Sequence, residues 1–227
     1  MRPGGCVLVA ATLLSSALCA TLPGCASGKK SAGKGDADRY LRLAYVQRER
    51  GETQQAIDSA KQALVRDPKS ADAHHFLGVM YLSVSQPKEA AAELRAAVRI
   101  NPYLTDAHNS LGVAYRELKD YDKALKEFQT ALNDRNYKTP EMVQLNLGNI
   151  YMDQGVLSEA IRCFQRSVDA NPSYAFGYLS LGTAYQKSGK PDLAAEQFRK
   201  VMSLAPESPE AARAKQLLEA GGKRSGP

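Results

Sequence analysis

Tryptophan is absent from the 227-residue chain, and cysteine and histidine are scarce, with four and three copies. Cys6 and Cys19 lie in an apolar N-terminal segment and Cys25 follows it, which leaves Cys163 as the one thiol in the long remainder. A single thiol forms no intramolecular disulfide, so this part of the chain must be stabilised by packing. We expect Cys163 to be a small buried hydrophobic side chain.

The residue combinations of metal binding and catalysis are missing as well. The histidines are His74, His75 and His108, and no cysteine or carboxylate completes a recognisable metal-ligand set with them. No serine or cysteine lies in a motif with a base partner, and no pair of carboxylates has an acid–base context. The sequence therefore predicts no enzyme, no metal site, no cofactor and no small-molecule substrate, and a packing role for the histidines.

The excess of basic over acidic side chains is small, and part of it lies in the two tails, at Lys29, Lys30, Lys34, Lys223 and Arg224. The formal net charge is +6, and without residues 1–24 it falls to +5, because Arg2 is the charged side chain removed. No stripe of basic side chains alternates with aromatic ones, which argues against a nucleic-acid partner. The chain is instead rich in alanine, the best helix former, which also lets helices approach closely. Packed helices are the expected architecture.

The first 25 residues differ from the rest in composition. Arg2 and the amino terminus are positively charged, and an apolar run over residues 7–18 follows, too short to span a membrane comfortably. The sequence Leu22-Pro23-Gly24-Cys25 then resembles the bacterial lipobox, in which a small residue precedes a cysteine that receives a diacylglycerol. We expect residues 1–24 to be a cleaved lipoprotein signal and Cys25 to be the lipid attachment site. The alternative is an ordinary secretory signal with an incidental cysteine.

The residues after Cys25 predict where the protein is anchored. Ala26 lies at the position where many Gram-negative lipoproteins retained at the inner membrane have aspartate. We therefore expect a protein anchored by lipid in the cell outer membrane, on its periplasmic face. Residues 25–36 are small, polar and rich in glycine, which predicts a flexible tether, and residues 221–227 are expected to be a flexible tail.

The remaining sequence repeats itself with a period of 34 residues. Leu-Gly followed by Tyr recurs at residues 77–81, 111–115, 147–151 and 181–185. Downstream of each copy, four residues after an alanine, comes a large apolar residue: Leu94, Phe128, Phe164 or Phe198. These positions together resemble the tetratricopeptide repeat (TPR), a pair of helices called A and B. A more degenerate copy precedes them.

The TPR resemblance implies an all-α fold, a right-handed α–α superhelix with a C-terminal capping helix. The repeats are expected at residues 37–70, 71–104, 105–140, 141–174 and 175–208, and the capping helix at residues 209–220. The eighth position of a repeat is small, so helix B can cross close to helix A. The turns between helices A and B are expected at Gly51, Ser85, Gly155 and Gly189. One repeat cannot bury its apolar face alone, so stacking stabilises the array.

The third repeat is longer than the others and carries a second resemblance. Its extra residues lead to Thr139-Pro140-Glu141, which predicts an N-cap, a proline in the first helical turn and a carboxylate that complements the helix dipole. Ala131-Leu132, Tyr137, Thr139-Pro140-Glu141 and Asn146-Leu147-Gly148 resemble the signature of the type IV pilus pilotins. These are outer-membrane TPR lipoproteins of the PilF and PilW type, and the subgroup of social gliding motility is the nearest match.

The pilotin resemblance implies a function and a partner. Pilotins help the pilus secretin, a PilQ-type protein, to reach or assemble in the outer membrane, and so support pilus biogenesis and pilus-driven motility. The alternative from a different class is a general periplasmic TPR scaffold lipoprotein that recruits envelope hydrolases or proteases. The insertion before Glu141 favours the first.

A candidate partner-binding groove follows from the positions in helix A that face the concave side of a TPR superhelix. In the first three repeats these positions are largely polar, whereas in the fourth and fifth they are mostly apolar. The candidate groove residues are Met142, Leu145, Asn149, Met152, Phe176 and Leu179. Such a cluster predicts binding of an apolar or amphipathic segment of the partner. The alternative is that the terminal helix or tight curvature covers these side chains.

Overall fold

A computed structural model describes residues 27–222, with side chains described from residue 34 to residue 221. The expected signal (residues 1–24), Cys25, Ala26 and residues 223–227 lie outside the described residues, so cleavage and lipidation stay predictions. Within the described part the chain forms eleven α-helices. They are α1 (Ser27–Glu49), α2 (Thr53–Arg66), α3 (Ala71–Ser83), α4 (Pro87–Ile100), α5 (Thr105–Glu117), α6 (Tyr121–Asn133), α7 (Pro140–Asp153), α8 (Leu157–Ala170), α9 (Ala175–Lys187), α10 (Pro191–Leu204) and α11 (Pro209–Gly222).

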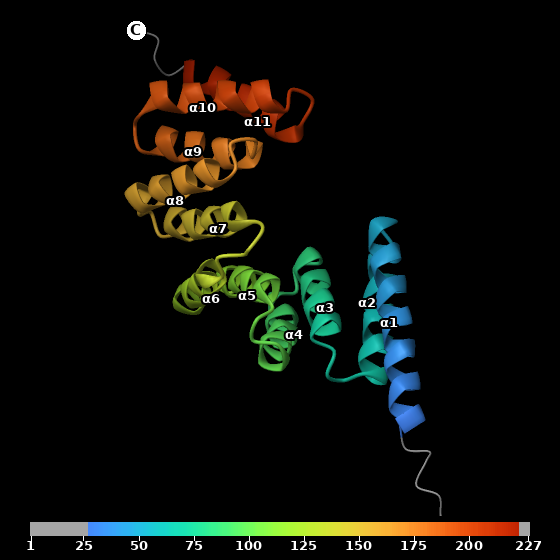
Figure 1. The fold of residues 1–227 in the computed structure, drawn as a ribbon. Helices are drawn as coiled ribbons and strands as arrows, with labels where there is room; N and C mark the ends of the chain where they lie inside the picture. Colours follow the sequence, from blue (N-terminus) through green and yellow to red (C-terminus); the bar gives the residue numbers. More distant parts are fainter. Residues whose placement is uncertain (1–26, 223–227) are drawn as a thin grey trace, which may run out of the picture.

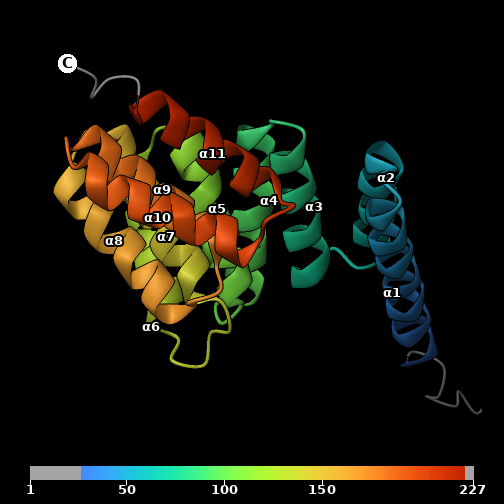
Figure 2. The same ribbon diagram turned by 90° about the horizontal axis from the view of Figure 1, so that it is seen from above.

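The helices form five antiparallel A–B pairs and a final single helix. Figure 1 shows the pairs following one another along an arc, from α1 and α2 at one end to α10 and α11 at the other. Consecutive helices pack against each other throughout, and from α3 onward each A helix also contacts the next A helix. Figure 2 shows α11 crossing the end of the stack over α9 and α10. The expected α–α superhelix with a C-terminal capping helix is confirmed.

Close approach of helices A and B depends on the glycine at the eighth position. At Gly112 in α5, an added Cβ atom would lie 2.5 Å from Cε1 of Phe128 in α6, closer than van der Waals contact permits. Gly78 has the same relation to Leu94, since its Cβ atom would lie 2.5 Å from the leucine Cγ. The Leu-Gly motif therefore sets the distance between the paired helices, and the large residue of helix B fills the space that glycine leaves.

The turns between helices A and B have a left-handed residue. Gly51, Gly155 and Gly189 have φ of 76°, 75° and 75°, and Ser85 has φ of 56°, so all four predicted turns are confirmed. The third repeat makes the same turn at Lys119, with φ of 60°, which the sequence did not reveal because lysine rarely adopts this conformation.

The core consists of small apolar clusters, each shared by neighbouring helices. Phe76, Phe128, Phe164 and Phe198 are among the largest fully or almost fully buried side chains, and alanines at the contact positions are almost completely buried. Cys163 is buried at 6% exposure, as expected, and burial raises the pKa of its thiol. Because each cluster involves only adjacent repeats, the array is stabilised by local contacts.

Three expectations about the ends of elements need correction. Residues 27–36 form the first turns of α1 and not a flexible tether, although their three glycines disfavour helix; the stretch lacks proline and continues without a break into the helix of the first repeat. Residues 221 and 222 belong to α11 and not to the tail. Thr139 occupies the N-cap position of α7, but its side chain makes no capping hydrogen bond. Pro140 and Glu141 lie in the first turn of α7, as expected.

The insertion in the third repeat lies between α6 and α7, which pack against each other less extensively than any other consecutive helices. Tyr137 from the insertion is partly buried against the core of the third repeat, with its hydroxyl near the side chains of Asp106, Asn109 and Thr139. Directly after the insertion, within the fourth repeat, the Ser167 hydroxyl of α8 donates to the Glu141 carbonyl oxygen of α7 at 2.8 Å. Tyr137 packs against a cluster that contains Phe128 of α6 and Val143 of α7, so the insertion separates two helix pairs while contacting the cluster that both share.

Candidate partner-binding groove

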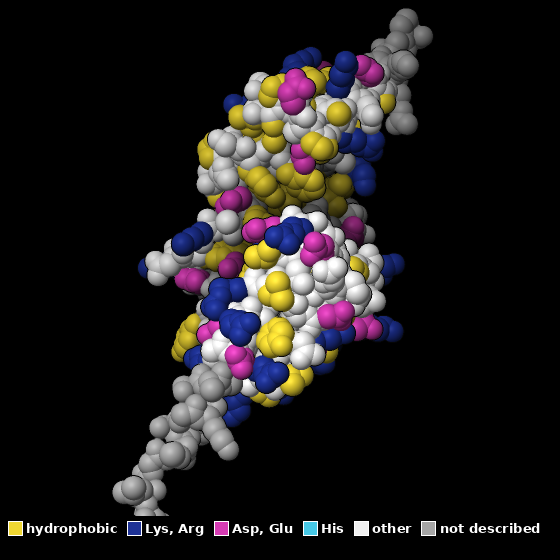
Figure 3. Space-filling model, turned by 90° about the vertical axis from the view of Figure 1, so that its right-hand side faces the viewer, with side chains coloured by type: hydrophobic (Ala, Val, Ile, Leu, Met, Phe, Trp, Pro, Cys, Tyr) yellow, Lys and Arg dark blue, Asp and Glu magenta, His cyan; other side chains and the backbone are white. Residues whose placement is uncertain are grey.

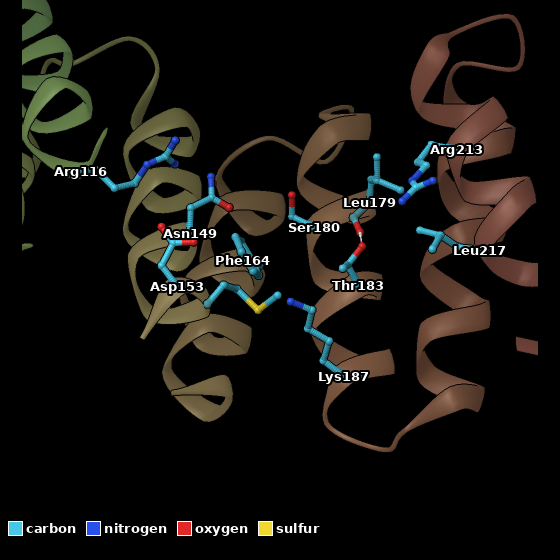
Figure 4. Close-up of a pocket in the computed structure, with 11 residues that line it drawn as sticks. Arg116, Asn149, Asp153, Phe164, Leu179, Ser180, Thr183, Lys187, Arg213 and Leu217 are labelled. Carbon is cyan, nitrogen blue, oxygen red and sulfur yellow. Dashed lines mark hydrogen bonds between the residues drawn. The ribbon is translucent and has the colours of Figure 1, made fainter. Parts of the chain in front are cut away.

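The concave side of the fourth and fifth repeats contains a cavity of about 490 Å³. Helices α5, α7, α9 and α11 supply most of its lining side chains, with Phe164 of α8 at its floor (Figure 4). The α7 side chains come from its second half, and those of α9 lie on the face opposite them. The helix stack therefore forms a groove that the capping helix closes on one side.

Three of the six candidate groove residues line this cavity. Asn149 and Met152 extend from α7 and Leu179 from α9. Leu179 is only partly exposed because it also packs against the core cluster that α10 and α11 share, which includes Ala211 and Ala214 of α11. The terminal helix therefore covers part of Leu179, as the alternative prediction stated.

Two further candidates lie outside the cavity but remain accessible. Met142 is 41% exposed and lines a neighbouring hollow with Tyr45, His75 and Tyr137. Phe176 is 42% exposed, and its ring centroid lies 6.4 Å from that of Tyr174. Figure 3, viewed from the side to which the arc opens, shows hydrophobic side chains gathered in the hollow between the two ends of the molecule.

Leu145 does not face the groove, and its assignment as a groove residue is wrong. It is 6% exposed and lies in a core cluster with Phe164 and Leu181. The reason is that Leu145 packs between α7, α8 and α9 and not into the groove. Asn109, at the same position in the third repeat, is also buried and accepts a hydrogen bond from Asn146 Nδ2 at 3.1 Å. Packing between neighbouring helices therefore covers this position in the third and fourth repeats.

Several cavity residues were not identified from the sequence. Asp153, Ser180, Thr183 and Lys187 are at positions of α7 and α9 that the candidate list did not include. Arg213 and Leu217 come from the capping helix. A usable signal existed, because α11 aligned as a sixth helix A has Arg213 at position five and Leu217 at position nine.

The first half of the concave surface has a different character. The hollow that contains Met142 also contains Arg48, Asp106, Asn109 and Ser110, so polar and charged groups surround its apolar side chains. His75 Nε2 lies 3.2 Å from Ser110 Oγ, and burial lowers the pKa of this histidine. The apolar groove residues thus continue into a more polar surface toward α3.

The other two histidines connect helices within and between repeats. His74 Nδ1 lies 2.6 Å from Glu93 Oε2, and its Nε2 lies 3.2 Å from the carbonyl oxygen of Pro68. His108 repeats this arrangement, 2.7 Å from Glu127 Oε2 and 3.1 Å from the Pro102 carbonyl oxygen. Both ring nitrogens face acceptors, so both must donate, and the hydrogen bond to the glutamate raises the pKa of each histidine.

The described residues contain neither a group of side chains suited to a metal ion nor a helix suited to crossing a membrane. No group of three or more His, Cys, Asp or Glu side chains among the described residues is arranged to hold a metal ion. Among the helices of residues 27–222, none combines the length and apolarity needed to cross a membrane. The groove can bind by apolar contact, charge and amide hydrogen bonds.

The chain matches descriptions of known protein families. Four family descriptions match it, all of them tetratricopeptide or TPR repeats, at residues 41–105, 105–134, 148–189 and 177–208. The chain is a tetratricopeptide-repeat protein. TPR arrays are scaffolds for protein partners, which agrees with a groove formed by successive A helices.

One curated relative of this TPR protein is the type IV pilus assembly protein PilF of Pseudomonas aeruginosa. The two chains are 39% identical over 71 residues, which is 31% of this chain and 28% of the relative. The matched segment thus spans well under half the length of the curated relative. The TPR protein is therefore homologous to a pilus assembly factor over a limited segment.

Solved structures support the TPR fold over a much larger part of the chain. The structure described as a functional characterization of Pseudomonas aeruginosa PilF has a TM-score of 0.69 at 23% identity, covering 85% of this chain and 91% of that one. PilW, described as a widely conserved type IV pilus biogenesis factor, has a TM-score of 0.68 at 22% identity, covering 83% and 94%. YrrB, a TPR protein with an unusual peptide-binding site, has a TM-score of 0.58 at 23% identity, covering 84% and 97%.

Proposed function

We infer that this chain is a pilotin: an outer-membrane lipoprotein that binds the PilQ-type secretin of the type IV pilus and promotes its localisation and assembly. The observation that carries this inference is the 39% identity to a type IV pilus assembly protein over 71 residues. The residue signature around Thr139-Pro140-Glu141 adds to it and favours the subgroup of the social gliding motility protein Tgl. In this role the protein supports pilus biogenesis and pilus-driven motility.

The groove supports a role in protein binding. Met142 and Phe176 expose more than a third of their surfaces on neighbouring A helices, and Met152 and Leu179 continue the apolar surface into the cavity. Burying one large apolar side chain is worth about 1.5–3 kcal/mol, so covering these residues with a partner segment would release a useful binding energy. An apolar or amphipathic segment of the secretin fits this surface.

The lipid anchor is tested by substitution at Cys25. The Cys25→Ala variant is expected to lose fatty-acid labelling and to leave the outer-membrane fraction. The reason is that the acyl chains attached at this cysteine, including the thioether-linked diacylglycerol, provide the membrane anchor. Unchanged labelling and fractionation of this variant would contradict lipidation at Cys25. An Ala26→Asp variant that relocates to the inner membrane would support outer-membrane sorting by the native residue.

The partner is tested by a pair of groove substitutions. Met142→Asp with Phe176→Asp places two charges on the apolar surface, and both positions are exposed enough for the fold to survive. The matched control is Val65→Asp with Leu193→Asp, two exposed apolar residues that line none of the hollows described above. We expect loss of heat-resistant secretin multimers from the outer membrane with the groove pair and none with the control.

Two experimental outcomes would argue against the pilotin function. Normal secretin multimers with a folded, lipidated groove variant would contradict the pilotin function. Loss of an envelope hydrolase or protease from crosslinked complexes in the same variant, with the secretin intact, would favour the scaffold function instead.

A further inference from the structure

The cavity between α7, α9 and α11 has an excess of positive charge. Arg116 of α5, Lys187 of α9 and Arg213 of α11 line it, and Asp153 is the acidic side chain among the lining residues. Figure 4 shows Arg116 and Arg213 on opposite sides of the space, with Lys187 between them. The three cations therefore surround the opening from three different helices.

These cations are not neutralised within the chain. Among the described residues, no salt bridge includes any of the three. Arg213 Nη1 donates a hydrogen bond to Gln216 Oε1 at 3.3 Å, which leaves its charge uncompensated. A cluster of like charges around a partly enclosed space carries a repulsive energy that an anionic ligand would relieve.

The surface between the cations is apolar and amide-bearing. Met152, Leu179 and Leu217 provide the apolar contacts, and Asn149 extends toward the same space. The Asn149 side chain makes no hydrogen bond to any described residue, so both its donor and its acceptor are available to a peptide backbone. The Thr183 hydroxyl already donates to the Leu179 carbonyl oxygen at 2.8 Å.

Charge also separates this cavity from the other half of the concave surface. The hollow near α3 is lined by one cation, Arg48, and one anion, Asp106, so its lining charges balance. An anionic ligand is therefore attracted more strongly to the cavity of α7, α9 and α11 than to that hollow. The difference in potential would fix which end of an extended ligand lies where.

We propose that this cavity binds an acidic amphipathic segment of the protein partner, in which carboxylates alternate with apolar side chains. The carboxylates pair with Arg116, Lys187 and Arg213, while the apolar side chains contact Met152, Leu179 and Leu217. The side-chain amide of Asn149 forms hydrogen bonds with the backbone of the bound segment. This assignment rests on the proposed function, because it names the chemistry of the partner segment that the groove binds.

The direct test uses synthetic peptides with blocked ends and the full chain in detergent. A fluorescent peptide of about twelve alternating leucines and glutamates is compared with one in which glutamine replaces glutamate and one in which lysine does. We expect the glutamate peptide to bind at least about tenfold more tightly than the glutamine peptide at low salt, and this preference to shrink as salt rises. The lysine peptide should not bind.

A matched pair of variants locates the binding site. Arg116→Gln, Lys187→Gln and Arg213→Gln combined should weaken binding of the glutamate peptide about tenfold, since each exposed charge pair contributes modestly. The control combines Lys69→Gln, Lys88→Gln and Lys126→Gln, which removes the same charge from exposed positions outside the cavity. Circular dichroism and thermal unfolding establish that both triple variants are folded.

The outcomes separate this proposal from the pilotin function. Equal binding of the glutamate and glutamine peptides, or equal weakening by the control variant, would overturn the acidic-segment assignment. If secretin multimers persist with the cavity triple variant but are lost with Met142→Asp and Phe176→Asp, the pilotin function stands and the acidic segment is wrong. If charge-selective binding is observed while both variants support normal multimers, the cavity assignment stands and the partner is not the secretin.

Discussion

Replacing Glu93 by glutamine would test whether His74 is positively charged in the folded repeat. In the native protein His74 donates to the Glu93 carboxylate and to the Pro68 carbonyl oxygen, so one imidazolium joins α3 to α4 and to the end of the preceding repeat. The glutamine variant keeps the shape and an acceptor oxygen but removes the charge. A charge-assisted hydrogen bond of this kind, partly exposed, is worth about 1–2 kcal/mol.

The pH dependence has a definite sign. The folded-state pKa of His74 is raised, chiefly by the hydrogen bond to Glu93, above its unfolded value near 6.5. The stabilisation is therefore fully present below that unfolded value and is lost as pH rises through the folded pKa. The wild-type protein should lose stability over this window, whereas Glu93→Gln should change less.

Urea unfolding at about pH 5.5 and about pH 9, followed by circular dichroism, measures this difference. We expect Glu93→Gln to lower the unfolding midpoint at the acidic pH and to have a much smaller effect at the alkaline pH. Glu127→Gln should behave in the same way, because His108 has the same partners one repeat later. An effect of equal size at both pH values would refute the charged pair.

Four further predictions concern packing, backbone and thiol reactivity. Gly112→Ala should destabilise the protein by about 1–3 kcal/mol, measured by thermal unfolding, because Phe128 occupies the space of the new methyl group. Leu145→Asp should cost at least about 3 kcal/mol and lower the helical signal, since it buries an unpaired carboxylate. Lys119→Gly should raise the melting temperature by an amount equivalent to about 1 kcal/mol, because glycine adopts positive φ without strain. Cys163 should react with a thiol reagent far more slowly in the native protein than in urea, as its burial and raised pKa both protect it.

The repeat spacing made most of the fold predictable. Positions such as Gly112 and Phe128 recur with fixed spacing because the same contact is made in each repeat, and the recurrence reveals the contact. The turn at Lys119 could not be predicted in this way, since lysine has no preference for the left-handed region. In that repeat the neighbouring helices impose the conformation.

The groove was predictable by position and not by exposure. Helix A positions nine and twelve do line the cavity, as Asn149 and Met152 show. Position five varies from repeat to repeat: Leu179 and Arg213 line the cavity, whereas Leu145 is covered, because packing between successive A helices differs along the stack. Predicting that Arg213 lines the cavity requires knowing that the capping helix packs as a further A helix of the stack.

The capping helix has a consequence for how the groove opens. Terminal helices exchange their amide hydrogens through local unfolding at low free energy, before the rest of an array does. Because α11 contributes Arg213 and Leu217 to the cavity and packs over Leu179, fraying of α11 removes one wall of the binding site. Local unfolding of the last helix and release of a bound segment are then one event, and an occupied groove would slow amide exchange in α11 more than in any other helix.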